Sequence, residues 1–208
     1  AGNVAHSYRT GLLAHGLDPQ EFTETERQLH DGTYAVVPKG GVRFPALLST
    51  FTSFSNKEGG TVLKDCGHLV ADGFMSANQP AGFQTGDHKA DQWAEASNDW
   101  NGPIVKNGLF FGGAGAAPES GWGVWGPMSS WFTIKDCAFV DFPSSTSQGN
   151  LGAAIKPCGA CHHEFGGFQY RMSGLEFENV GQKLQFGTDR ESIVRDLDGS
   201  LTGWAGGW

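Results

Sequence analysis

Short apolar segments of one pattern recur five times along this chain of 208 residues. Each contains an aliphatic residue, a spacer and usually Asp or Asn, and three positions later a residue that is usually Phe or Met. The aliphatic anchors of the five segments are Val70, Val105, Ile134, Met172 and Val194. Internal repetition of this kind indicates stacked structural units, each of which buries its apolar face against its neighbours.

The anchors are separated by 35, 29, 38 and 22 residues. Because a regular solenoid or a propeller repeats at a nearly constant interval, this spacing excludes both. It is typical of a parallel β-helix, whose coils consist of short strands joined by loops of variable length. We therefore predict an all-β fold, a right-handed parallel β-helix with long loops such as Gly112–Gly126 and Pro143–Gly152. Chance alignment within another Gly-rich β fold, such as a sandwich, is the alternative.

Composition agrees with stacked strands. Gly supplies 32 of the 208 residues, and this excess weakens helices, while the aromatic content of 12% is too high for a disordered chain. The net charge of −8, without a basic patch, argues against a nucleic-acid partner. No apolar run reaches the length that spans a membrane. We interpret residues 1–208 as a single β-helix region that is a fragment of a larger extracellular protein.

Three segments also resemble a known family. Asn3–Ser7 with Gly11-Leu12, then Phe51–Asn56, then Asp196-Leu197-Asp198-Gly199-Ser200-Leu201-Thr202-Gly203 are similar, in the same order, to motifs of the G8-domain proteins with parallel β-helix repeats. This family includes fibrocystin-L and the cell-migration-inducing and transmembrane hyaluronidases. The resemblance implies a β-helix in a large secreted or surface-anchored protein, with the G8 domain itself upstream of the first residue.

From this resemblance we expect a structural and adhesive module of an extracellular, cell-surface or ciliary-coat glycoprotein. The expected partners are other segments or copies of the same large protein, neighbouring surface proteins and polysaccharide. The alternative is a glycan-cleaving, hyaluronidase-like enzyme segment. No catalytic residue of those relatives can be placed on this sequence, so we predict none and favour a role without catalysis.

Aromatic residues are the candidates for contact with a glycan or a partner, because a flat ring stacks on the face of a sugar. Trp93 and Trp100 stand among four acidic residues, and Trp122 and Trp125 form a second group. The four acids, which could serve glycoside chemistry as pairs, are Asp87, Asp91, Glu95 and Asp99. A solvated acidic loop anchored by two tryptophans is the simpler interpretation.

The four cysteines, Cys66, Cys137, Cys158 and Cys161, are disulfide candidates. Cys158-Gly159-Ala160-Cys161-His162 also matches the attachment pattern of c-type haem, with His162 as the axial ligand. The same residues are of the types that bind zinc. A structural disulfide is the interpretation we favour, and a haem redox protein is the minor alternative.

Asp196-Leu197-Asp198-Gly199 resembles the start of a calcium loop, so Asp196 and Asp198 are candidate metal ligands, and His162 of the Cys-x-x-Cys-His segment is a further candidate. The rest of the calcium-loop pattern is missing. We therefore favour another interpretation, in which Asp196 belongs to the recurrent Asn/Asp positions and Gly199-Ser200 forms a turn. We expect no cofactor, with Ca²⁺ as the alternative and haem c least favoured.

Overall fold

The computed structural model describes residues 2–15, 26–28, 34–36, 46–64, 69–85, 104–113, 121–126, 132–142, 152–157, 169–186 and 193–206. Within these ranges the chain forms strands and turns and no helix, so none of them contains a helix able to cross a membrane.

Seventeen strands form three parallel sheets. Sheet 1 contains, in spatial order, β1 (Asn3–His6), β6 (Phe51–Phe54), β9 (Met75–Ala77), β12 (Leu109–Phe111), β15 (Ala138–Phe142) and β18 (Glu176–Val180). Sheet 2 contains β16 (Ala153–Lys156), β13 (Trp122–Trp125), β10 (Ala81–Gln84), β7 (Gly59–Lys64) and β2 (Thr10–His15). Sheet 3 contains β19 (Ile193–Asp196), β17 (Gln169–Ser173), β14 (Phe132–Lys135), β11 (Ile104–Lys106), β8 (Leu69–Asp72) and β5 (Ala46–Ser49).

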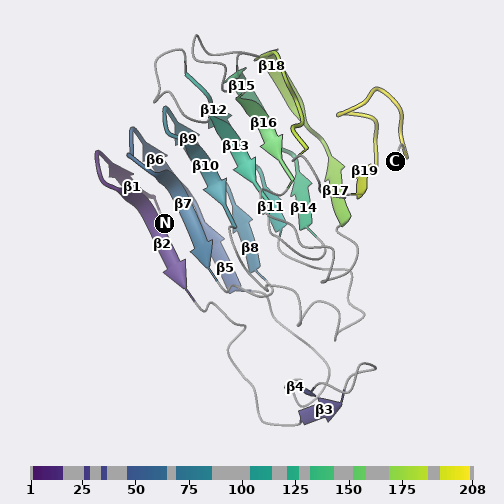
Figure 1. The fold of residues 1–208 in the computed structure, drawn as a ribbon, viewed down its shortest axis with the longest axis horizontal. Coiled ribbons are helices and arrows are strands. Elements are labelled where there is room, and N and C mark those ends of the chain that lie inside the picture. Colours follow the sequence, from purple (N-terminus) through teal and green to yellow (C-terminus); the bar gives the residue numbers. More distant parts are fainter. Residues whose placement is uncertain are drawn as a thin grey trace.

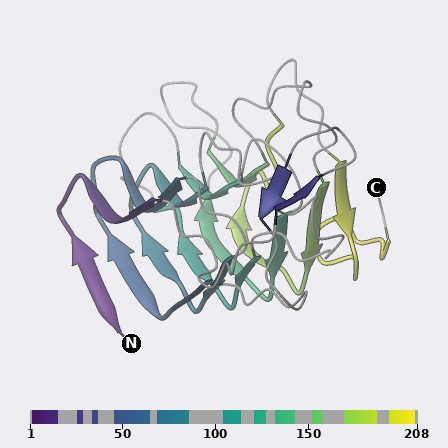
Figure 2. The same ribbon diagram turned by 90° about the horizontal axis from the view of Figure 1, so that it is seen from below.

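Each coil passes through sheet 3, sheet 1 and sheet 2 before the chain begins the next coil, as in β8–β9–β10. The strands of successive coils lie side by side along the long axis, from the N-terminus at one end to the C-terminus at the other (Figures 1 and 2). A separate antiparallel pair, β3 (Glu26–Gln28) and β4 (Tyr34–Val36), belongs to none of the three sheets. The predicted all-β parallel β-helix is therefore confirmed.

The observed register corrects the sequence alignment at its two ends. Val105, Ile134 and Met172 pair as predicted, but the residue that pairs with Val105 on the other side is Ala71 rather than Val70. Met172 pairs with Asp196 rather than with Val194. The first error arises because Val70 and Ala71 are both small apolar residues. The second arises because a carboxylate occupies a position that is apolar in the other coils.

The loop predicted over Gly112–Gly126 is also partly wrong, because β13 within it pairs with both β10 and β16. Of the loop predicted over Pro143–Gly152, all but the last residue lies outside the described residues.

The interior is organised in columns of equivalent residues. The inward column of sheet 1 is polar in its N-terminal part and aromatic in its C-terminal part: Ala5, Ser53, Ser76, Phe110, Phe139, Phe177. Phe139 stacks on Phe110 and on Phe177, with ring centroids 5.3 and 5.5 Å apart. Offset stacking of this kind is a favourable arrangement of aromatic rings.

A glycine column in sheet 2 provides the space for these side chains. Gly11, Gly60, Gly82 and Gly123 lie in register across four neighbouring strands. A Cβ atom on Gly123 would lie 2.7 Å from the Phe139 ring, and one on Gly60 would lie 2.3 Å from the Ser53 hydroxyl. These four of the 32 glycines are explained in this way, because the backbone of sheet 2 approaches the inward column of sheet 1 closely.

Candidate functional site

A column of left-handed turns joins sheet 3 to sheet 1. The residues that occupy it have φ angles between 49° and 83°, and they are Gly2, Thr50, Gly73, Asn107, Asp136 and Gly174. Five of them donate their backbone N–H to a carbonyl of the following coil, as Asp136 does to Ser173 at 2.9 Å. Because Gly, Asn and Asp tolerate this conformation best, the recurrent Gly, Asn and Asp of the repeat are explained by backbone geometry.

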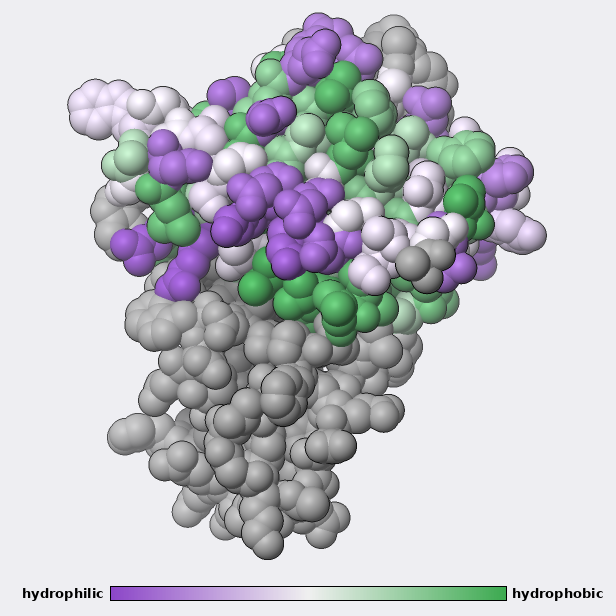
Figure 3. Space-filling view, turned by 180° about the vertical axis from the view of Figure 1, so that it is seen from behind, coloured by the Kyte–Doolittle hydropathy of each residue, from purple (hydrophilic) through white to green (hydrophobic). Residues whose placement is uncertain are grey.

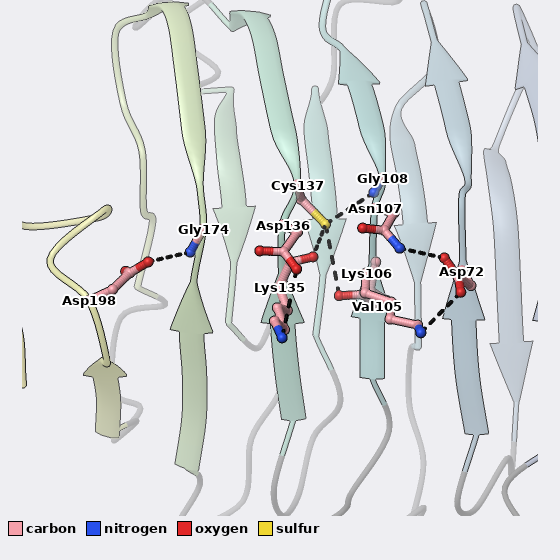
Figure 4. Close-up of polar contacts among 10 residues, drawn as sticks. All are labelled: Asp72, Val105, Lys106, Asn107, Gly108, Lys135, Asp136, Cys137, Gly174 and Asp198. Atoms are coloured by element: carbon pink, nitrogen blue, oxygen red, sulfur yellow. Dashed lines mark hydrogen bonds and ion pairs between the residues drawn. The ribbon is translucent and has the colours of Figure 1, made fainter.

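Polar side chains connect neighbouring coils along this column (Figure 4). The Asn107 amide donates to the Asp72 carboxylate at 2.8 Å, and the Lys106 ammonium lies 3.0 Å from it. The hydrogen bond from Asn107, and then Lys106, lower the pKa of Asp72. These contacts hold coils together at the surface. They do not bring two acids to opposite sides of a groove, as glycoside hydrolysis requires.

Cys137 directly follows Asp136 of this column, and its thiol is buried (Figure 4). The Gly108 N–H donates to its Sγ at 3.4 Å, and the thiol lies 3.2 Å from the Lys135 carbonyl. Burial raises the pKa of Cys137 to about 12, so the reactive thiolate is absent at neutral pH. The thiol is free, and the disulfide predicted for Cys137 is therefore wrong.

The other cysteines, Cys66, Cys158 and Cys161, lie outside the described residues, as does His162. The haem motif, the zinc alternative and the disulfides of these three cysteines stay predictions.

The two aspartates of the predicted calcium loop both accept hydrogen bonds from the turn that follows them. Asp196 is buried, and its carboxylate accepts backbone N–H groups from Gly199, Leu201 and Thr202 and the Thr202 hydroxyl. It occupies an inward position beyond Met172, so the assignment of Asp196 to the recurrent Asn/Asp column is wrong. Asp196 instead anchors the turn that follows β19.

The Asp198 carboxylate accepts a hydrogen bond from the Gly174 N–H at 2.6 Å (Figure 4). In the preceding coils, the corresponding N–H donates to a main-chain carbonyl instead. Hydrogen bonds from Ser200 and from Gly174 lower the pKa of Asp198. Among the described residues, no three His, Cys, Asp or Glu side chains gather as ligands for an ion. Calcium binding by Asp196 and Asp198 stays a prediction that this geometry does not favour.

The candidate aromatic contact residues Trp122 and Trp125 lie together on sheet 2, with ring centroids 4.9 Å apart. The Lys156 ammonium lies 3.9 Å from the Trp122 ring centroid and 4.7 Å from that of Trp125, and burial lowers the pKa of Lys156. The Trp122 indole N–H donates to Gln185 at 2.9 Å. The pair therefore has internal partners, including a cation over the ring faces that a sugar would need. Trp93, Trp100 and the four acids near them lie outside the described residues.

The outward face of sheet 1 is a surface that the sequence analysis did not identify. It presents two columns, which are Val4, Thr52, Met75, Leu109, Ala138, Glu176 and His6, Phe54, Ala77, Phe111, Val140, Glu178. Met75, Phe111 and Phe54 are exposed by 44%, 38% and 37%. In Figure 3, hydrophobic side chains gather on the upper part of the molecule, where β9, β12 and β15 lie in Figure 1. An apolar sheet face of this kind indicates a contact surface.

Sequence comparison supports part of the family resemblance. The chain is similar to fibrocystin-L from Homo sapiens, with 25% identity over 172 residues, and to fibrocystin-L from Mus musculus, with 25% identity over 173 residues. These alignments cover 78% and 79% of this chain and 4% of each relative. A shorter alignment of 81 residues, at 32% identity, covers 39% of the chain and 2% of fibrocystin from Mus musculus.

The chain thus spans a small fraction of the curated relatives that it matches. No family model matches it, and no solved structure matches it significantly. The similarity is to segments of fibrocystin-L and fibrocystin, whereas the predicted link to the hyaluronidases and to a G8 domain stays a prediction.

Proposed function

We propose that this chain is a structural and adhesive segment of a large extracellular or cell-surface protein, such as a component of a ciliary coat. The observation that carries the proposal is the apolar outward face of sheet 1 on a rigid stack of coils. Because each coil is hydrogen-bonded to the next, the stack holds that face in a fixed shape. Similarity to short segments of fibrocystin-L supports the view that such a stack serves as one part of a longer polypeptide.

The glycan-cleaving alternative has less support. Its candidate acids lie outside the described residues, and the described tryptophan pair is occupied by Lys156. Contact with polysaccharide through Trp122 and Trp125 would require Lys156 to move from the ring faces. We therefore place protein contact through sheet 1 ahead of glycan contact through sheet 2.

Cell binding by beads coated with the chain tests the proposal. Beads carrying wild-type chain, Phe111→Glu or Leu47→Glu are incubated with cultured animal cells, and bound beads are counted by flow cytometry. Leu47 is the matched control, because it is exposed by 64% but lies on sheet 3. We expect Phe111→Glu to reduce binding by roughly tenfold, as the loss of a central contact does, and Leu47→Glu to leave binding unchanged. Equal binding by all three chains would contradict the proposal. So would bead binding that hyaluronan fragments block but that Phe111→Glu does not reduce.

A further inference from the structure

The apolar face of sheet 1 has different side-chain sizes in its two halves. In the column that begins at His6, Phe54 and Ala77 stand on the N-terminal side of the centre, and Phe111 and Val140 on the C-terminal side. A two-fold axis along the strand direction would lay β9 of one copy over β12 of the other. Ala77 would then face Phe111, and Phe54 would face Val140. In this column a small residue would thus meet a large one at the centre of the contact, while in the other outward column Met75 would face Leu109.

Polar groups divide the face in the same direction. Its C-terminal strand presents two exposed carboxylates, Glu176 and Glu178, while its N-terminal strand presents the imidazole of His6, which can donate a hydrogen bond to a carboxylate. The His6 ring stacks on Phe54 at a centroid distance of 4.7 Å and an interplanar angle of 11°. This stacking fixes the direction of the imidazole. The same two-fold axis would lay β1 over β18, which would bring His6 opposite Glu178.

The other face-to-face arrangement is unfavourable. A two-fold axis along the stack would lay every strand over its own copy, so that Glu176 and Glu178 would meet the same carboxylates of the partner. Like charges placed opposite each other across an interface oppose association. The repulsion between like charges and the side-chain sizes in the column that begins at His6 therefore favour the same one of the two symmetric arrangements.

We propose that the outward face of sheet 1 binds the same face of a second copy of this chain, with the two stacks related by a two-fold axis along the strands. This inference rests on the proposed adhesive function and names the partner. The face extends across six strands, or about 24 Å at the usual strand spacing. An interface of this extent is small. We therefore expect a weak dimer in isolation, with a dissociation constant of roughly 10–100 µM.

Sedimentation equilibrium between about 10 µM and 1 mM, a range that brackets this affinity, tests the proposal. We expect the wild-type mass to rise from 22.2 kDa towards twice that value. Phe111→Glu should weaken the dimer by at least about tenfold, whereas Leu47→Glu should not change it. Circular dichroism and the urea midpoint of each variant establish that it is folded. A wild-type chain that stays monomeric at 1 mM, or a dimer that Phe111→Glu does not affect, would overturn the proposal.

Charge exchange tests the orientation. His6→Glu places a carboxylate opposite Glu178 and should weaken the dimer by about fivefold, as an unfavourable exposed pair does. Adding Glu178→Lys to His6→Glu should restore the dimer, because opposite charges then face each other. Failure of the second substitution to restore association would also overturn the proposal.

The two proposals can fail separately. A monomeric wild-type chain whose cell binding is nevertheless lost in Phe111→Glu would overturn the dimer and leave the adhesive function supported. A dimer that binds no cells would support self-association and contradict the adhesive function.

Discussion

In the N-terminal coils the inward column of sheet 1 contains Ser53 and Ser76, whereas in the C-terminal coils the same column contains Phe110, Phe139 and Phe177. The serines accept hydrogen bonds from the Gln79 amide, which is itself buried. The aromatic rings instead stack on one another. One backbone geometry is thus stabilised in two ways, by directional polar contacts at one end and by apolar packing at the other.

The polar end is a connected network. The Asn56 amide donates to Gln79 at 2.9 Å, and its carbonyl oxygen accepts the backbone N–H of Tyr8 at 3.1 Å. Three successive coils are joined in this way. Such a network tolerates little change, because removal of one member leaves the other buried groups without partners. The aromatic end depends on volume and shape, so there the removal or addition of atoms should have the larger effect.

The largest expected effect is at the aromatic end. Phe139→Ala removes a fully buried ring that lies between two others, and we expect the free energy of unfolding to fall by about 3–5 kcal/mol in urea denaturation. Phe111→Ala is the control, because its ring is on the outward face of the same sheet. An equal loss in both variants would show that the inward column is not the main apolar core.

Gln79→Ala tests the polar end. It removes the buried amide that bonds to Asn56, Ser53 and Ser76, and we expect a loss of about 2–3 kcal/mol in the same assay. Gln182→Ala, at a half-buried amide that contacts one carbonyl, should cost much less. If Gln79→Ala lost less than 0.5 kcal/mol, a size that is typical of surface substitutions, the polar network would contribute little to stability.

Gly123→Ala tests whether the aromatic end has space for one more methyl group. Its Cβ would lie 2.7 Å from the Phe139 ring and from the Ala154 carbonyl oxygen. We expect a loss of about 1–3 kcal/mol from overpacking. Gly121→Ala is the matched control, since nothing lies within 4 Å of its Cβ position. Similar thermal midpoints for the two variants would contradict the close approach of sheets 1 and 2.

The smallest expected effect is at Cys137, where the contribution of the thiol to the free energy of unfolding depends on pH. Burial raises the pKa of its thiol from 9.0 to about 12, so above pH 9 the unfolded chain releases a proton that the folded chain retains. The free energy of unfolding should therefore fall with rising pH, by about 1.4 kcal/mol between pH 8 and pH 10 relative to Cys137→Ala. The same pH dependence in wild type and Cys137→Ala would show that this thiol is not shielded from water.

The sequence repeat predicted the stack because Val105, Ile134 and Met172 keep their register and are followed by turn residues. It failed at Asp196, where the position is recognisable only from the hydrogen bonds of the following turn. It also missed the outward face of sheet 1. Strand alternation could have found Phe54 and Phe111, but their strands carry apolar residues on both faces, so the pattern does not tell inside from outside.

The hydrogen bonds between coils run along the axis of the stack, because every pairing in the three sheets joins a strand to the next coil. A pulling force along that axis would load these bonds one coil at a time, and the stack would open from an end. A force across the axis would load many bonds of a sheet together. The hydrogen bonds that Asp196 accepts from the turn after β19 add to the contacts that such a force would have to break in that coil.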